Sequence, residues 1–205
     1  QVDWPWKLRI RSFGNFSVEV DGQLIDQTSK THRRSMEFLQ TLIALGGENV
    51  SKDMLSQILW PDSEGDKANH ALDNLLHRTR KLIGTDLLTM DAGQIHLNKS
   101  QCWLDTWALK AFRKNLTQND DTSMAQVELL LGIYQGGFLP NTENSFTLIA
   151  REQHCRNFLD SVKQLVDALF QQEIPYKAIN CLLQAIDREP NHESLYFLLA
   201  QYYSA

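Results

Sequence analysis

The spacing of apolar residues changes midway along the chain, and this change limits the possible folds more than any other feature. Apolar and polar side chains alternate, as is typical of short strands, over residues 8–13 (LRIRSF), 17–20 (SVEV) and 87–98. In the second half, apolar residues recur at the three- and four-residue spacing of helices. This contrast predicts two domains, an α+β domain over 1–103 and an all-α domain over 104–205.

The order of the predicted elements in the first half is that of a winged helix preceded by a small sheet. A turn at Asp21-Gly22 leads into a third short strand at 23–25. Three helices follow; the second begins after a capping residue, Ser51, and the third covers about 67–83. The second and third helices would form a helix-turn-helix pair, and the 87–98 hairpin would be the wing. In such a fold the third helix enters the major groove of DNA.

The second half is predicted to hold helices alone. They begin near Trp107 and continue over about 123–134, 145–172, 175–188 and 192–204. Five residues of the last pair follow roughly the spacing of a tetratricopeptide helix pair, namely Tyr176, Ala178, Leu183, Ala185 and Pro190. The predicted fold class is therefore an α+β winged helix-turn-helix followed by an all-α, tetratricopeptide-like helical domain.

The solvent side of the third predicted helix carries side chains that can bind DNA. Asparagine pairs with adenine and arginine with guanine, while lysine and arginine also bind phosphates. A basic cluster before the first helix and a lysine after the hairpin would add phosphate contacts. The predicted DNA-binding residues are Arg33, Arg34, Asn69, His70, Asn74, His77, Arg78, Arg80, Lys81 and Lys99. The alternative is an ordinary solvated face, because Asp73 on it repels phosphate and the hairpin tip carries no positive charge.

The charge balance argues against strong non-specific binding to nucleic acid. The net charge is −5. Residues 1–104 hold 12 basic and 13 acidic residues, giving −1, and residues 105–205 hold 8 and 12, giving −4. Binding to DNA would therefore need local clusters and specific contacts, since the phosphate term supplies most non-specific affinity. A second hypothesis follows: the chain is an interaction scaffold whose winged helix binds protein instead of DNA.

Several classes of protein are disfavoured by missing motifs. The sequence has no HExxH, P-loop or GxSxG motif, so we expect no enzyme and no cofactor. The three cysteines, Cys102, Cys155 and Cys181, form no CxxC pair, which argues against a metal site and fits a reducing, cytoplasmic setting.

No apolar run approaches the roughly 20 residues of a membrane span. The chain begins at Gln1 with neither a signal peptide nor an initiator methionine, and we expect a longer or processed protein.

The first half resembles a known family in several stretches. They are LRIRSFGNFSVEVDGQLI at 8–25, Arg33-Arg34, VSKDMLSQILWPD at 50–62 and HRTRKLIG at 77–84. Together they are similar to OmpR-type winged helices, specifically those of the Streptomyces antibiotic regulatory protein group. By position, Arg78, Arg80 and Lys81 match basic positions of that family's recognition helix, whereas Thr79 stands where a leucine is expected. The resemblance implies DNA binding, often at direct repeats.

The second half resembles the bacterial transcriptional activation domain that follows such winged helices. The matching stretches are LDTWALKAF at 104–112, LLLGIYQGGFLPN at 129–141 and AIDREPNHESLYFLLAQYY at 185–203. This resemblance implies an activator that recruits RNA polymerase. It also implies a helical surface for self-association or for a sensor module of a longer chain. The predicted partners are thus double-stranded DNA and proteins of the transcription machinery, with no membrane.

Overall fold

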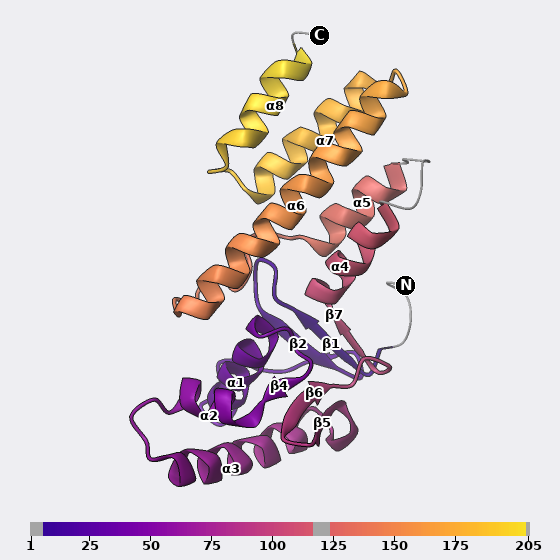
Figure 1. The fold of residues 1–205 in the computed structure, drawn as a ribbon. Coiled ribbons are helices and arrows are strands. Elements are labelled where there is room, and N and C mark those ends of the chain that lie inside the picture. Colours follow the sequence, from indigo (N-terminus) through magenta and orange to yellow (C-terminus); the bar gives the residue numbers. More distant parts are fainter. Residues whose placement is uncertain (1–5, 117–123, 204–205) are drawn as a thin grey trace. The chain divides into compact units, whose positions relative to one another are not determined.

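The computed structural model describes residues 6–116 and 124–203, and its contacts divide the chain into two units (Figure 1). The first unit holds the N-terminal segment through Arg11 and residues 17–104. The second holds Asp105 onward together with Ser12–Phe16, a short segment from near the start of the chain. The sequence pattern alone does not show this assignment of residues 12–16.

A four-stranded sheet forms one part of the first unit. Its strands are β1 (Leu8–Arg11), β2 (Ser17–Val20), β3 (Gln23–Leu24) and β7 (Cys102–Leu104), in the order β3-β2-β1-β7. The predicted turn joins β2 to β3, with both Asp21 and Gly22 at positive φ. β7 pairs parallel to β1 and was missed in the sequence. Its three residues are all buried, so they show no alternation that would reveal a strand.

Three helices and a second sheet complete the first unit. They are α1 (Arg33–Ala44), α2 (Lys52–Leu59), α3 (Gly65–Ile83), the 3-10 turn η1 (Thr85–Leu87), and strands β4 (Val50–Ser51), β5 (Leu88–Asp91) and β6 (Gln94–Leu97). Ser51 caps α2 as predicted, because its side chain accepts the Met54 N–H at 3.4 Å. α3 packs against both α1 and α2. β5 and β6 form the predicted hairpin, and β6 also pairs with β4.

The second unit is helical in its described residues apart from one isolated β-bridge. Its helices are α4 (Asp105–Leu116), α5 (Met124–Ile133), α6 (Ser145–Gln171), α7 (Pro175–Arg188) and α8 (Glu193–Tyr203). The predicted helix ends at 123 and 204 lie outside the described residues. α6 packs against α7, and α7 against α8 (Figure 1). Asn144 caps α6 by accepting the Thr147 N–H at 2.9 Å, and Pro175 occupies the first turn of α7.

An aromatic cluster forms the core where α5 ends and α6 passes. Tyr134 stacks on Phe158 with ring centroids 4.0 Å apart. Phe13, from the segment Ser12–Phe16, lies 4.6 Å from Tyr134 and is 1% exposed. Phe138 and His154 also contact Phe13 by their rings. The early segment is therefore part of the hydrophobic core of the helical unit.

Backbone pairing fixes the same segment. Phe13 and Phe138 form an isolated antiparallel bridge, and the Gly14 N–H donates to the Gly137 carbonyl at 3.0 Å. Gly14 has a φ of +75°, and a Cβ there would lie 3.1 Å from the Gln135 carbonyl oxygen. A side chain at position 14 is thus disfavoured by both conformation and space. The predicted strand over 8–13 was too long, because residues 12 and 13 direct their backbone groups to partners in the helical unit.

Asp105, the first residue of α4, is the main polar partner of this segment. Its carboxylate is fully buried and accepts the Ser12 hydroxyl at 2.6 Å and the Phe13 N–H at 2.8 Å, together with the Ser12 N–H at 2.5 Å. Burial raises the pKa of Asp105 to about 6, although the hydrogen bonds from Ser12 and Phe13 oppose the shift. The buried acid therefore joins α4 to a segment more than 90 residues earlier.

His154 makes the stability of the helical unit depend on pH. Burial lowers the pKa of His154 to about 4, below the 6.5 of an exposed histidine. The unfolded chain then binds more protons between those values, so this contribution to stability is full above pH 6.5 and declines as the pH falls toward 4. We expect the stability of the wild type relative to His154→Phe to decrease by about 1–2 kcal/mol between pH 7 and 5. Urea unfolding at both pH values measures this difference; an unchanged gap would contradict it.

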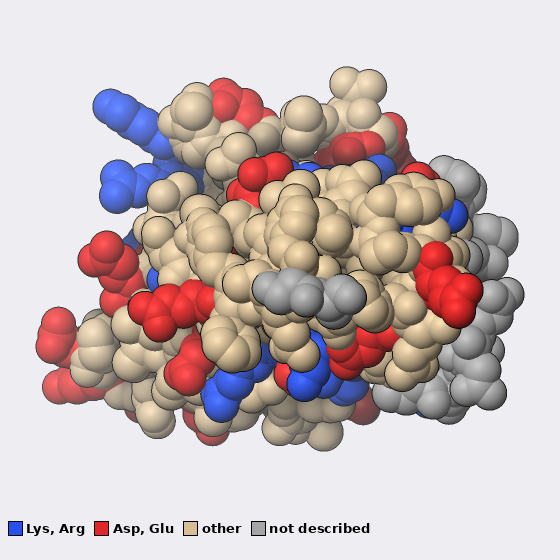
Figure 2. Space-filling model, turned by 90° about the horizontal axis from the view of Figure 1, so that it is seen from above, with Lys and Arg blue, Asp and Glu red and all other residues tan. Residues whose placement is uncertain are grey.

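The last two helices expose large apolar side chains. Tyr176 and Leu183 of α7 and Tyr196, Phe197 and Tyr203 of α8 are all at least 45% exposed. Figure 2, seen from above the view of Figure 1, shows a mostly uncharged surface with scattered acidic and basic groups. Within the described residues, no helix is both long enough and apolar enough to cross a membrane.

Candidate nucleic-acid interface

The exposed side of α3 is a continuous polar stripe. Its buried residues, Ala68, Leu72, Leu75, Leu76, Thr79 and Ile83, face the unit's core. The exposed residues between 70 and 81 recur every three or four positions, which places them on one side of the helix. They are His70, Asp73, Asn74, His77, Arg78 and Lys81. At 1.5 Å per residue this stripe is about 16 Å long, and a helix, about 10–12 Å in diameter with its side chains, fits a major groove about 12 Å wide.

Two predicted DNA-binding residues of α3 lie beside the stripe. Asn69 is half-buried, and its Oδ1 is buried with no hydrogen-bond partner. Arg80 is also half-buried, and its Nε donates to the Leu88 carbonyl of β5 at 2.8 Å. Arg80 therefore links the helix to the hairpin, a structural role that the sequence did not reveal.

Asp73 is the only carboxylate on the stripe, and a lysine neutralises it. Lys52, the first residue of α2, places its Nζ 2.6 Å from the Asp73 Oδ1. This ion pair reduces the repulsion that Asp73 alone would exert on a phosphate. Lys52 was not among the predicted site residues. Its position directly after the capping residue of the second helix could have indicated this contact, because a helix-turn-helix brings the start of that helix against the third helix.

The remaining predicted contacts lie on other elements. Arg33 and Arg34 begin α1 and are exposed, with Arg34 paired to Glu37 at 2.7 Å and lying over the Trp60 ring at 5.8 Å. Lys99, after the hairpin, pairs with Glu48 at 2.5 Å. Both pairs lie at the surface, although Glu48 is half-buried; the free energy of such an ion pair is small and a phosphate can compete.

Thr79 is accommodated without loss of hydrogen bonding. It is fully buried on the core side of α3, and its hydroxyl donates to the Leu75 carbonyl at 2.8 Å. The threonine at this position, where the family resemblance expects leucine, thus leaves no unpaired polar atom in the core.

The fold and this site define an α+β winged-helix unit followed by a helical unit. No protein-family model matches the sequence, and none of the curated proteins matches it. Among solved structures, the chain is similar to EmbR of Mycobacterium tuberculosis, determined in complex with a low-affinity phosphopeptide. The TM-score is 0.72 at 16% identity, over 97% of this chain and 55% of EmbR. The chain thus spans about half the length of EmbR, and the likeness confirms the predicted winged helix and helical unit as a fold.

At 16% identity the likeness to EmbR shows the fold alone, so the expected absence of enzymatic activity stays a prediction. The helical unit of EmbR does not by itself establish a tetratricopeptide arrangement here, and that finer prediction stays a prediction.

Proposed function

We propose that this chain is a DNA-binding transcriptional regulator of the Streptomyces antibiotic regulatory protein type, in which α3 occupies the major groove. The observation that carries the proposal is the α3 stripe, which presents Asn74, His77, Arg78 and Lys81 on one exposed side. The sequence resemblance and the fold of EmbR, itself a regulator of that type, point to the same function.

The roles within the stripe follow from side-chain chemistry. Arg78 forms bidentate contacts with guanine, Asn74 and His77 reach base edges, and Lys81 binds phosphate. Arg33 and Arg34 at the start of α1 bind the adjacent backbone, where the helix dipole also favours an anion. Because the net charge is −5, non-specific binding is weak, and specific binding requires tandem sites or self-association. The helical unit contacts proteins, RNA polymerase among them, and the regulator acts as an activator in the cytoplasm.

We expect Arg78→Ala to weaken specific DNA binding by about 1–3 kcal/mol. The operator is first selected from sheared DNA of the source genome, and the enriched fragment is then titrated at two salt concentrations. Arg156→Ala is the matched control, because Arg156 is an exposed arginine of α6 that lies outside the α3 stripe. Wild type and control should bind equally, and binding of both should fall as salt rises.

The second hypothesis, a scaffold whose winged helix binds protein, has its own outcome in the same experiment. It takes first place if no DNA sequence is enriched at low salt even at high protein concentration. The ion pairs of Arg34 and Lys99 are relevant here, because a phosphate would have to displace Glu37 or Glu48 to bind these two cations. Equal binding of wild type and Arg78→Ala to an enriched operator would instead remove α3 as the reading element.

A further inference from the structure

We propose that a basic hollow between α4 and α6 binds an acidic peptide segment of a partner protein. The hollow has a volume of about 300 Å³ and is lined by Lys110, Arg113, Lys114, Asp160, Ser161 and Gln164. Three cations face one carboxylate, which gives the lining a formal charge of +2. None of these six residues was predicted from the sequence to bind a ligand. The proposal rests on the protein-binding role proposed above and adds the kind of partner, a protein with an acidic peptide segment.

The charge of the hollow is opposite to that of its surroundings. Residues 105–205 carry a net charge of −4, yet three of their eight basic residues line this one hollow. Low-dielectric walls around a concave site with a net charge of one sign strengthen its attraction for a ligand of the other sign. An acidic segment would be attracted to the hollow, whereas a long polyanion such as DNA would be repelled by the rest of the unit. Charge complementarity therefore favours a short acidic peptide.

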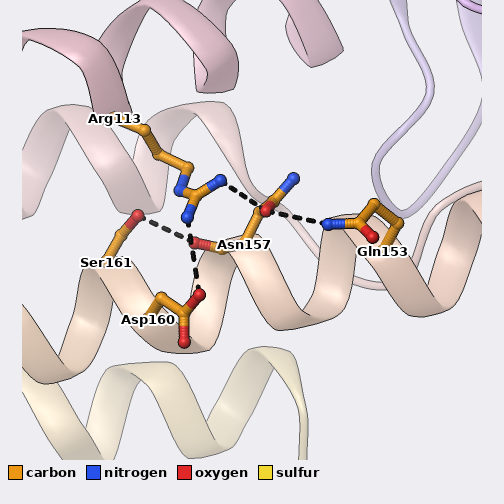
Figure 3. Close-up of polar contacts among 5 residues, drawn as sticks. All are labelled: Arg113, Gln153, Asn157, Asp160 and Ser161. Carbon is orange, nitrogen blue, oxygen red and sulfur yellow. Dashed lines mark hydrogen bonds and ion pairs between the residues drawn. The ribbon is translucent and has the colours of Figure 1, made fainter.

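One wall of the hollow is held in place by hydrogen bonds (Figure 3). Arg113 of α4 donates to the Asn157 side chain of α6 and pairs with Asp160 at 3.4 Å. Gln153 donates to the same Asn157 oxygen at 3.2 Å, and the Ser161 hydroxyl donates to the Asn157 carbonyl at 2.8 Å. The guanidinium thus fixes the spacing of the two helices, and a ligand need not order it on binding.

The hollow continues along α6, which gives the site the length of a peptide. A second hollow of about 340 Å³ shares Asp160 and Gln164 with the first and extends to Gln171. From residue 160 to 171 the helix rises about 16 Å, the length of about five extended residues. The amides of Gln164 and Gln171 can bond a peptide backbone. The second hollow is lined by Lys163 and two carboxylates, and the carboxylates would repel acidic side chains. We therefore place the acidic side chains of the ligand in the first hollow.

The test is a selection of random octapeptides, displayed on phage, by the complete chain. We expect the selected peptides to carry neighbouring Asp or Glu residues. The best of them is synthesised with a fluorescent label and titrated against wild type, Lys110→Glu and Lys177→Glu. Lys110→Glu should weaken its binding about tenfold or more, because the formal charge of the lining falls from +2 to 0. Lys177→Glu makes the same charge change on α7, outside both hollows, and should bind like the wild type.

Three results would overturn the proposal. The first is that acidic peptides are not enriched, and the second is that Lys110→Glu binds the peptide as tightly as the wild type. The third is that a DNA duplex displaces the peptide and that Lys110→Glu weakens the binding of this duplex as well. The last result would make the hollow a phosphate contact. Arg78→Ala, measured on the same peptide and on the operator, separates the two proposals. If Arg78→Ala no longer binds the operator but still binds the peptide, the two sites are separate. If no acidic peptide is selected although the protein binds its operator, only the peptide site is disproved.

Discussion

Phe13→Ala is expected to lower the free energy of unfolding of the helical unit by about 3–5 kcal/mol. The side chain is 1% exposed and lies in contact with Tyr134, Phe138 and His154. Truncation removes its buried area and its ring contacts and leaves a cavity that Tyr134, itself stacked on Phe158, cannot readily fill. Urea unfolding followed by circular dichroism at 222 nm measures the change, with the helices of both units contributing to the signal.

Leu24→Ala is the matched control for this truncation. Leu24 lies on β3 and is 71% exposed, so its removal should change stability by less than about 0.5 kcal/mol. If Phe13→Ala were no more destabilising than Leu24→Ala, residues 12–16 would not be part of the helical core in solution.

Asp105→Ala is expected to destabilise the same unit by about 3–5 kcal/mol. The substitution leaves the N–H groups of Ser12 and Phe13 and the Ser12 hydroxyl without their acceptor in a buried site. A buried donor without an acceptor still carries the full free-energy cost of its desolvation. Here three donors lose the carboxylate that they share. The midpoint and slope of urea unfolding at pH 7 give the change in free energy.

Asp105→Asn is the informative companion. Its amide oxygen can still accept the two backbone N–H groups, and its NH2 can donate to the Ser12 hydroxyl, which is free to rotate. We therefore expect the asparagine variant to retain most of the stability that alanine loses. Equal losses in both variants would show that the negative charge of Asp105, and not its hydrogen bonding, holds Ser12 and Phe13.

Much of the fold was predictable because its signals are local. The strands and helices of the first half follow from alternation, from helical spacing and from caps such as Ser51, all within a few residues. β7 was missed because three buried residues carry no periodic pattern. The placement of Ser12 and Phe13 was missed for a related reason: their partners Asp105 and Tyr134 are far along the chain, and no local pattern encodes such a pairing.

The candidate site was only partly predictable, because a sequence shows which residues can bind DNA but not which of them already have partners. Helical spacing was sufficient to place Asn74, His77 and Arg78 on one side of α3. It was not sufficient to show that Arg80 bonds to the hairpin or that Lys52 neutralises Asp73. Both contacts join different elements, and their distances depend on how those elements pack.

Residues 12–16 also set an order of events during synthesis. Ser12 and Phe13 leave the ribosome more than 90 residues before Asp105, and Tyr134 and Phe158 emerge later still. At roughly 5–20 residues per second, this is a delay of about 5–30 seconds. For that time Phe13 has none of its native aromatic neighbours, and the segment between β1 and β2 is open to chaperones and proteases. The helical unit can complete its aromatic core only after Tyr134 and Phe158 have emerged, and it needs residues 12–16 to do so, so it cannot mature independently of the start of the chain.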